Sequence, residues 1–71
     1  MRTAEDWIAA YAAELGQPVP DADEIAAMLR LASVAAHASE RRAAPIACWI
    51  AAAAGVPLDE ACRRAQVVSA Q

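Results

Sequence analysis

The sequence has no phenylalanine and no lysine, and it contains only two tryptophans, one tyrosine and two glycines. The shortage of aromatic residues excludes a thick core of large side chains. Alanine occupies 22 of the 71 positions, and because alanine is depleted in β-strands, a β-sandwich is excluded as well. A hydrophobic content of 59% with a net charge of only −3 excludes a disordered chain.

A membrane-spanning run is also missing. The longest apolar stretch, residues 43–56, has 14 residues and contains Pro45, whereas a bilayer requires about 20. The N-terminus lacks the basic flank of a secretion signal, and two cysteines without a ligand cluster indicate a reducing compartment. We therefore expect a cytoplasmic protein. Abundant alanine, with arginine in place of lysine, is typical of a GC-rich bacterial genome.

Helix start and stop signals predict an all-α domain. Thr3 and Asp21 are N-cap residues, each followed three positions later by an acid. Gly16 and Gly55 suit left-handed helix ends, and Pro45 suits a first turn. These signals predict one compact four-helix domain over residues 1–71, with helices near 3–15, 21–38, 45–54 and 58–68.

The large apolar residues are the natural candidates for its core. We expect Trp7 and Trp49 to fill most of the central volume, with Ile46, Trp49 and Ile50 forming an inward stripe on the third helix. On the second helix a broad apolar arc is predicted, with Leu31 near its margin.

Charge is distributed unevenly along the chain. Residues 1–24 carry one arginine and six acids, a net charge of −5, whereas residues 25–71 carry five arginines and three acids, a net charge of +2. Most of the acids fall in the first turns of predicted helices, where the helix dipole favours them. An overall negative charge disfavours nucleic-acid binding. Only Arg63 and Arg64 on the last helix support the alternative of a DNA-binding regulator.

Cys48 and Cys62 lie about seven residues either side of Gly55, at matching heights on a predicted helical hairpin. They are interpreted as two small buried thiols, with a disulfide or a metal pair as alternatives. A zinc site needs four ligands, and the sequence has one histidine, so no metal site is predicted.

A polar segment follows the second helix. His37 lies on its polar side and is interpreted as a partly exposed residue whose charged form suits the helix C-terminus. Alternatively, it forms an anion site with nearby arginines, because guanidinium groups and free helix N–H groups bind phosphate or carboxylate. The candidate binding residues are Arg30, His37, Glu40, Arg41 and Arg42.

Catalytic sets are missing. No Ser/His/Asp combination, glycine-rich phosphate loop or carboxylate pair outside helix caps is present. A chain of this length also has little room for a ligand cavity of roughly 300 Å3. We therefore predict no enzymatic activity, no catalytic residues and no cofactor.

Two segments carry a resemblance to a known family. Residues 7–16 read Trp-Ile-Ala-Ala-Tyr-Ala-Ala-Glu-Leu-Gly, and the second segment, residues 33–47, contains the motif His37-x-x-Glu40-Arg41-x-Ala43-Ala44-Pro45. Nearly the whole chain resembles an uncharacterised family of small helical domains, a domain of unknown function, from high-GC Gram-positive bacteria. Family members stand alone or are fused behind a nucleotidyltransferase domain similar to molybdenum-cofactor guanylyltransferases.

The resemblance implies an accessory role near molybdopterin chemistry. Arg42 stands where relatives often have proline, and Trp49 replaces a Phe-like residue. The motif is either structural, with Glu40 pairing with Arg41 or capping helix ends, or a recognition site. Ala43, Ala44, Pro45, Trp7 and Trp49 are assigned structural roles.

Size, missing catalytic sets and the resemblance together predict a non-enzymatic helical accessory domain. It would bind a protein partner or form a homodimer, in connection with molybdenum-cofactor biosynthesis. The alternative is a small-anion or nucleotide-binding module that uses the segment from His37 to Arg42.

Overall fold

The computed structural model describes residues 2–71 and contains four α-helices, which confirms the predicted fold class. The helices are α1 (Ala4–Glu14), α2 (Ala22–Ala38), α3 (Ala43–Ala54) and α4 (Leu58–Ser69). Helix α3 begins at Ala43, two residues before the predicted start. Pro45 therefore occupies its third position, which is still in the first turn, where a backbone N–H has no partner within the helix.

Side chains cap the first two helices as predicted. The Thr3 hydroxyl accepts a hydrogen bond from the Asp6 N–H at 3.1 Å. Asp21 accepts from the Glu24 N–H at 2.8 Å, while the Glu24 carboxylate accepts from the Asp21 N–H at 2.9 Å. Each reciprocal bond satisfies an N–H group that the helix itself leaves free, so the start of α2 is well determined.

Both glycines adopt the left-handed conformation at helix ends, with φ angles of 67° at Gly16 and 71° at Gly55. At the end of α1 the Gln17 N–H donates to the Ala12 carbonyl at 2.8 Å, and the Gly16 N–H donates to the Ala13 carbonyl at 3.1 Å. These two bonds form a Schellman motif, which ends the helix and turns the chain into the proline-containing linker.

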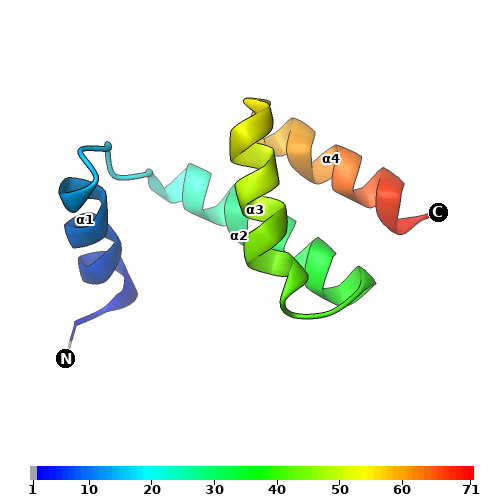
Figure 1. The fold of residues 1–71 in the computed structure, drawn as a ribbon, viewed down its shortest axis with the longest axis horizontal. Helices are drawn as coiled ribbons and strands as arrows, with labels where there is room; N and C mark the ends of the chain where they lie inside the picture. Colours follow the sequence, from blue (N-terminus) through cyan, green and yellow to red (C-terminus); the bar gives the residue numbers. More distant parts are fainter. Residues whose placement is uncertain (1) are drawn as a thin grey trace.

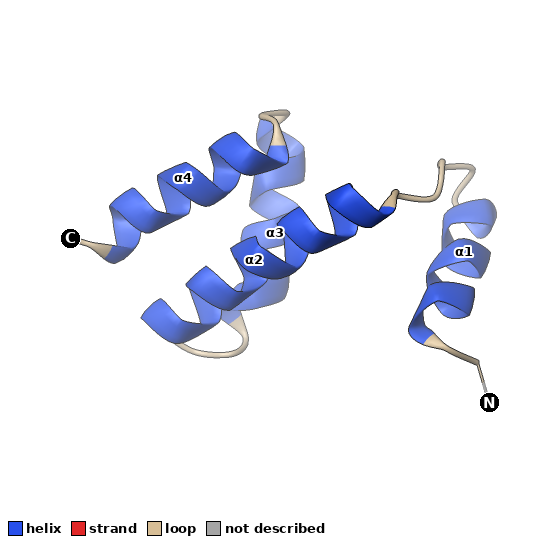
Figure 2. Ribbon diagram, turned by 180° about the vertical axis from the view of Figure 1, so that it is seen from behind, coloured by secondary structure: helices blue, strands red, loops and turns tan. Residues whose placement is uncertain are grey.

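Helix α2 is the central element of the molecule. Helices α3 and α4 both pack extensively against it, and α1 lies at one end of the long axis (Figure 1). The view from behind shows the linker between α1 and α2 as a bent loop, with α1 set apart from the other three helices (Figure 2). The molecule measures 39 × 26 × 18 Å, and its long dimension reflects this placement of α1.

The core is small and made mostly of small side chains. Its buried residues are Ala27, Leu31, Ala51, Ala61 and Cys62. Leu31 is only 3% exposed and is the one large aliphatic side chain among them. The prediction that Leu31 lies near the margin of the apolar arc is therefore wrong, because α3 and α4 pack against α2 on the side that carries it.

The prediction that two tryptophans fill the centre is also wrong. Trp7 is 55% exposed and Trp49 is 72% exposed. Helix α3 instead packs Ala47, Cys48 and Ala51 against or into the core. Small side chains allow two helix backbones to approach closely, whereas an indole ring between them would hold α2 and α3 apart. The predicted inward stripe is consequently exposed and does not form the core.

Candidate functional site

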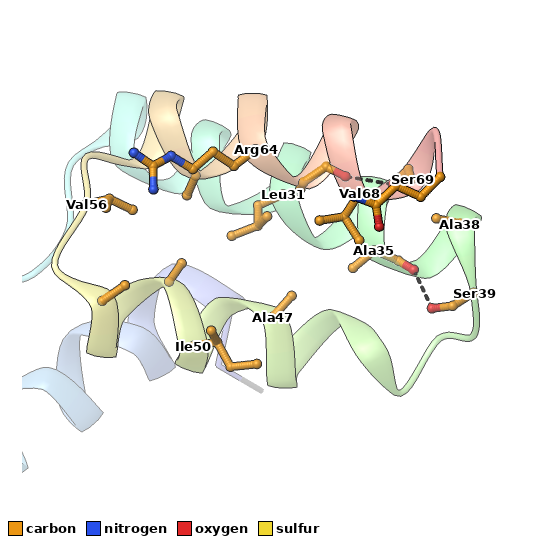
Figure 3. Close-up of a pocket in the computed structure, with 15 residues that line it drawn as sticks. Leu31, Ala35, Ala38, Ser39, Ala47, Ile50, Val56, Arg64, Val68 and Ser69 are labelled. Atoms are coloured by element: carbon orange, nitrogen blue, oxygen red, sulfur yellow. Dashed lines mark hydrogen bonds between the residues drawn. The ribbon is translucent and has the colours of Figure 1, made fainter.

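An apolar groove lies between α3 and α4, with α2 as its floor, and we call it the α3–α4 groove. Its volume is about 540 Å3, so the expectation that a chain of this length has little room for a cavity of roughly 300 Å3 is wrong. In Figure 3, Leu31 lies at the floor, Ala47 and Ile50 line the α3 side, and Val68 lines the α4 side. This space remains because α3 and α4 both pack on α2 and make few contacts with each other.

The groove offers few free hydrogen-bonding groups. The Ser39 hydroxyl donates to the Ala35 carbonyl at 2.8 Å, and the Ser69 hydroxyl donates to the Ala65 carbonyl at 2.8 Å (Figure 3). Arg64 is the only charged side chain of its lining within the described part of the chain. The groove therefore suits an apolar surface rather than a polar metabolite.

A second hollow of about 930 Å3 continues from the groove around the start of α3. It shares Ala35 and Ile50 with the groove, and it adds Ile46, Glu40 and Arg42 to the lining. On the adjoining surface Ile46 is 59% exposed, Ile50 is 56% exposed and Trp49 is 72% exposed. One continuous apolar surface thus covers α3 and the groove.

The residues predicted to form an anion site are exposed but not drawn together. His37 Nδ1 lies 3.0 Å from the Ser33 hydroxyl and 2.8 Å from the Ser33 carbonyl oxygen, so its described partners are on its own helix. Arg30 is exposed on α2. No hydrogen bond or ion pair among residues 2–71 links either side chain to the Glu40–Arg42 turn.

In that turn, Glu40 pairs with Arg42 rather than with Arg41. The Arg42 Nε atom donates to the Glu40 carboxylate at 2.7 Å, and both side chains are largely exposed. The Ala43 and Ala44 N–H groups donate to the Glu40 and Arg41 carbonyls at 3.0 and 3.1 Å. The backbone of the motif therefore closes the turn from α2 into α3, a structural role consistent with one of the two interpretations.

A charge cluster on α4 was missed by the sequence analysis. Glu60 accepts from Arg63 Nε at 3.0 Å and from Arg64 Nε at 2.9 Å. Hydrogen bonds from these two guanidinium groups hold the pKa of Glu60 at about 2, below its ordinary value of 4.5, and Glu60 in turn raises the pKa of Arg63. The spacing of three and four residues on one helix was the signal for this cluster.

The two cysteines are free thiols, and both contact α2. The Cys62 thiol is buried and donates to the Ala27 carbonyl at 3.3 Å, while the Cys48 thiol lies 3.9 Å from the Met28 carbonyl oxygen. Burial raises the pKa of Cys48, and the neighbouring Cys62 thiol adds to this effect. The interpretation as small packing residues is confirmed for Cys62, and Cys48 is half-buried.

Within residues 2–71, no three side chains of His, Cys, Asp or Glu are grouped so that they could hold a metal ion. Among the same residues, no helix has both the length and the apolar character that a membrane crossing requires.

The groove itself was not predicted. A partial signal was the row of small residues in α3, Ala47, Ala51 and Ala54, at helical spacing. Small residues permit close packing, but α3 is apolar on every side, so this row alone did not identify the packed face.

No curated protein matches this chain, and no solved structure matches it. The model of one protein family, described as "Domain of unknown function (DUF6457)", matches residues 1–71. The match covers both segments on which the resemblance rests, and it agrees with the assignment to an uncharacterised small domain. The chain therefore belongs to the DUF6457 family.

Proposed function

We propose that this chain is a non-catalytic protein-interaction domain whose α3–α4 groove binds an apolar helix with acidic flanks. The observation that carries the proposal is the reversed distribution of its large side chains. Trp7, Trp49 and Tyr11 are each more than half exposed, while alanine and cysteine form most of the core. Exposed apolar surface of this extent usually marks a protein–protein contact.

The shape and chemistry of the groove support a helical ligand. It is open along its length and lined by α2, α3 and α4, as in helix-in-groove recognition. Residues 25–71, which build it, carry a net charge of +2, so they favour a ligand of opposite charge. The apolar lining accounts for affinity, and the arginines near its edge account for orientation.

The biological setting of the proposal comes from the resemblance alone. Relatives fused to a domain similar to molybdenum-cofactor guanylyltransferases support a role beside such an enzyme, in a bacterial cytoplasm. In this role the domain supplies contacts rather than chemistry. Copurification of this domain with a nucleotidyltransferase of that class tests the setting, and loss of that association in a groove variant links it to the groove.

The groove itself is tested by amide NMR of the labelled domain titrated with a designed acidic, leucine-containing helical peptide of about three turns. We expect the amide shifts to concentrate at residues lining the groove. Val68→Glu should abolish them, because Val68 lines the groove and is 65% exposed. Val67→Glu is the matched control, because Val67 is the neighbouring exposed residue and lies outside that lining.

Two results would contradict the proposal. One is the absence of peptide-dependent shifts in the groove of a monomeric domain. The other is a response to GTP or inorganic phosphate at His37, Arg41 and Arg42 without any response to the peptide, which would favour the anion-binding alternative.

A further inference from the structure

Among residues 2–71, the structure leaves both the α3–α4 groove and the apolar side of α1 exposed. On α1, Trp7, Tyr11 and Leu15 are 55%, 51% and 56% exposed, and they share one side of the helix. The rings of Trp7 and Tyr11 stack with their centroids 4.9 Å apart, so the stripe is already ordered. Figure 1 places α1 at the opposite end of the molecule from the C-terminal end of α4.

We propose that the groove of each copy takes up α1 of a second copy, so that two chains form a reciprocal, helix-exchanged dimer. This inference rests on the proposed function and names the groove's occupant. In such a dimer the bound helix and the groove come from the same kind of chain, so no second protein is required.

The lengths of the two surfaces match. The apolar stripe of α1 covers eight residue steps, from Trp7 to Leu15. The groove has the same length, from Leu31 to Ser39 along its floor and from Ala61 to Ser69 along its α4 side. Each segment is helical or ends one residue past a helix, so each is about 12 Å long. The apolar stripe of α1 can therefore lie along the groove without projecting past it.

The charges of the two surfaces are complementary. Residues 1–24 have a net charge of −5, with Glu5, Asp6 and Glu14 on α1 itself, whereas residues 25–71 have a net charge of +2. Arg64 lines the groove and Arg42 lines the hollow that continues from it. Arg42 pairs with Glu40, and both side chains are exposed. Arg64 pairs with the half-buried Glu60, which Arg63 also holds. Surface pairs of this kind exchange partners at little cost.

The area is sufficient for a stable interface. The exposed parts of Trp7, Tyr11 and Leu15 amount to on the order of 300 Å2, given the size of such side chains. A reciprocal exchange buries this area twice, each time with the part of the groove that it covers. The total, on the order of 1,000 Å2, reaches the lower end of the size range of specific protein interfaces.

The linker favours exchange over folding back. Pro18 and Pro20 lie in the segment between the end of α1 and the start of α2. Each proline restricts its own φ angle and the residue before it, so the segment is conformationally restricted. This short, restricted connection holds α1 away from the groove of its own chain, and a short hinge that cannot fold back favours exchange of the helix with a second copy.

The test measures the mass of the full chain by light scattering over a concentration series. We expect a dimer, twice the 7.4 kDa of one chain. Tyr11→Glu damages the α1 stripe and Val68→Glu damages the groove, and each should weaken dimerisation at least tenfold. Ala9→Glu and Val67→Glu are the matched controls, since they add the same charge outside the stripe and the groove, and they should leave the dimer intact.

Mixing gives the decisive observation. The Tyr11→Glu chain keeps a good groove and the Val68→Glu chain keeps a good α1. An equimolar mixture should therefore form more dimer than either variant alone, through one intact contact, although less than the wild type. Circular dichroism confirms that each variant is folded. If Val68→Glu loses its helical signal, Ile50→Glu takes its place, because Ile50 also lines the groove and is 56% exposed.

Three results would overturn the inference: a wild-type monomer at every concentration, a dimer insensitive to Tyr11→Glu, or no dimer on mixing. In each case, amide NMR of the monomeric chain, or of the Tyr11→Glu chain, with the designed acidic peptide decides the wider proposal. Shifts in the groove would leave the proposed function standing with another occupant, and their absence would remove both.

Discussion

The thiol of Cys62 on α4 donates a hydrogen bond to the carbonyl oxygen of Ala27 on α2 at 3.3 Å. A sulfur atom reaches a helix carbonyl only where the two backbones lie close together. Here alanine provides that closeness, since Ala27 and Ala61 are both buried at the same helix pair. The contact is typical of how this domain packs, because its small side chains are buried and most of its large ones are exposed.

The first prediction contrasts two apolar residues. Leu31→Ala should destabilise the domain by about 2–5 kcal/mol, because it leaves a cavity at the one large side chain in the core. Trp49→Ala should change the free energy of unfolding by no more than about 0.5 kcal/mol, because Trp49 is 72% exposed. Urea denaturation of both variants measures the difference, and equal losses would contradict this core.

The second prediction concerns the end of α3. Gly55 has a φ angle of 71°, and an added Cβ would meet no atom within 4 Å. Gly55→Ala should therefore cost about 1 kcal/mol through backbone conformation alone. Gly55→Asn should cost less, because asparagine tolerates the left-handed region better. Thermal unfolding compares the two, and a larger loss in the asparagine variant would indicate a steric cause instead.

The third prediction concerns acid stability. The pKa of Glu60 is about 2 in the folded chain and 4.5 ordinarily, so its ionised form is favoured by folding. This contribution is complete above pH 4.5 and is lost as the pH falls from 4.5 toward 2. Replacing both Arg63 and Arg64 with glutamine should flatten that part of the stability profile, measured by urea denaturation between these pH values.

The exposure of the cluster limits the size of this effect, because solvent screens the three side chains. Carbon NMR of the Glu60 carboxylate gives an independent readout. A titration midpoint unchanged by loss of the two arginines would show that they do not cause the lowered pKa.

The fourth prediction concerns the thiols. Burial and the neighbouring Cys62 raise the pKa of Cys48 above its ordinary value of 9.0, so the native chain holds less thiolate at a given pH. Alkylation by iodoacetamide at pH 8 should be several-fold slower in the native chain than in urea. Because the protonated form is favoured by folding, this contribution to stability is complete below pH 9.0 and is lost as the pH rises above it.

Local chemistry made most of the helix boundaries predictable. Thr3, Asp21, Gly16 and Gly55 act through atoms within a few residues of themselves, and the structure places each at the helix end that its chemistry indicates. The start of α3 was missed by two residues because no side chain caps it. Its first N–H groups bond to the Glu40 and Arg41 carbonyls instead.

Apolar periodicity did not predict which side of α3 packs against the core. Nearly every residue of Ala43–Ala54 is apolar, so the helix has no polar face to mark the outside. The stripe with the largest residues was taken as the core, and the packed side proved to be Ala47, Cys48 and Ala51. How closely two backbones approach depends on both helices, and one helix alone does not contain that information.

The candidate site was likewise predictable in part. The sequence marked the segment from His37 to Pro45 because its residue types stand out against alanine. The structure assigns its backbone to the turn between α2 and α3 and pairs Glu40 with Arg42. The groove was not predicted, because its lining residues, such as Ala35, Ala47 and Val68, carry no distinctive chemistry. They also come from three different helices.

By itself, the sequence determined the all-α class, the number of helices and the places where they end, because caps, prolines and glycines act over a few bonds. Its 22 alanines also determined that packing must be close. Only the tertiary structure decided which faces meet, and therefore that both tryptophans are exposed and a groove remains on α2. The physical reason is that burial of apolar surface is non-directional, so the choice of face belongs to the whole set of helices.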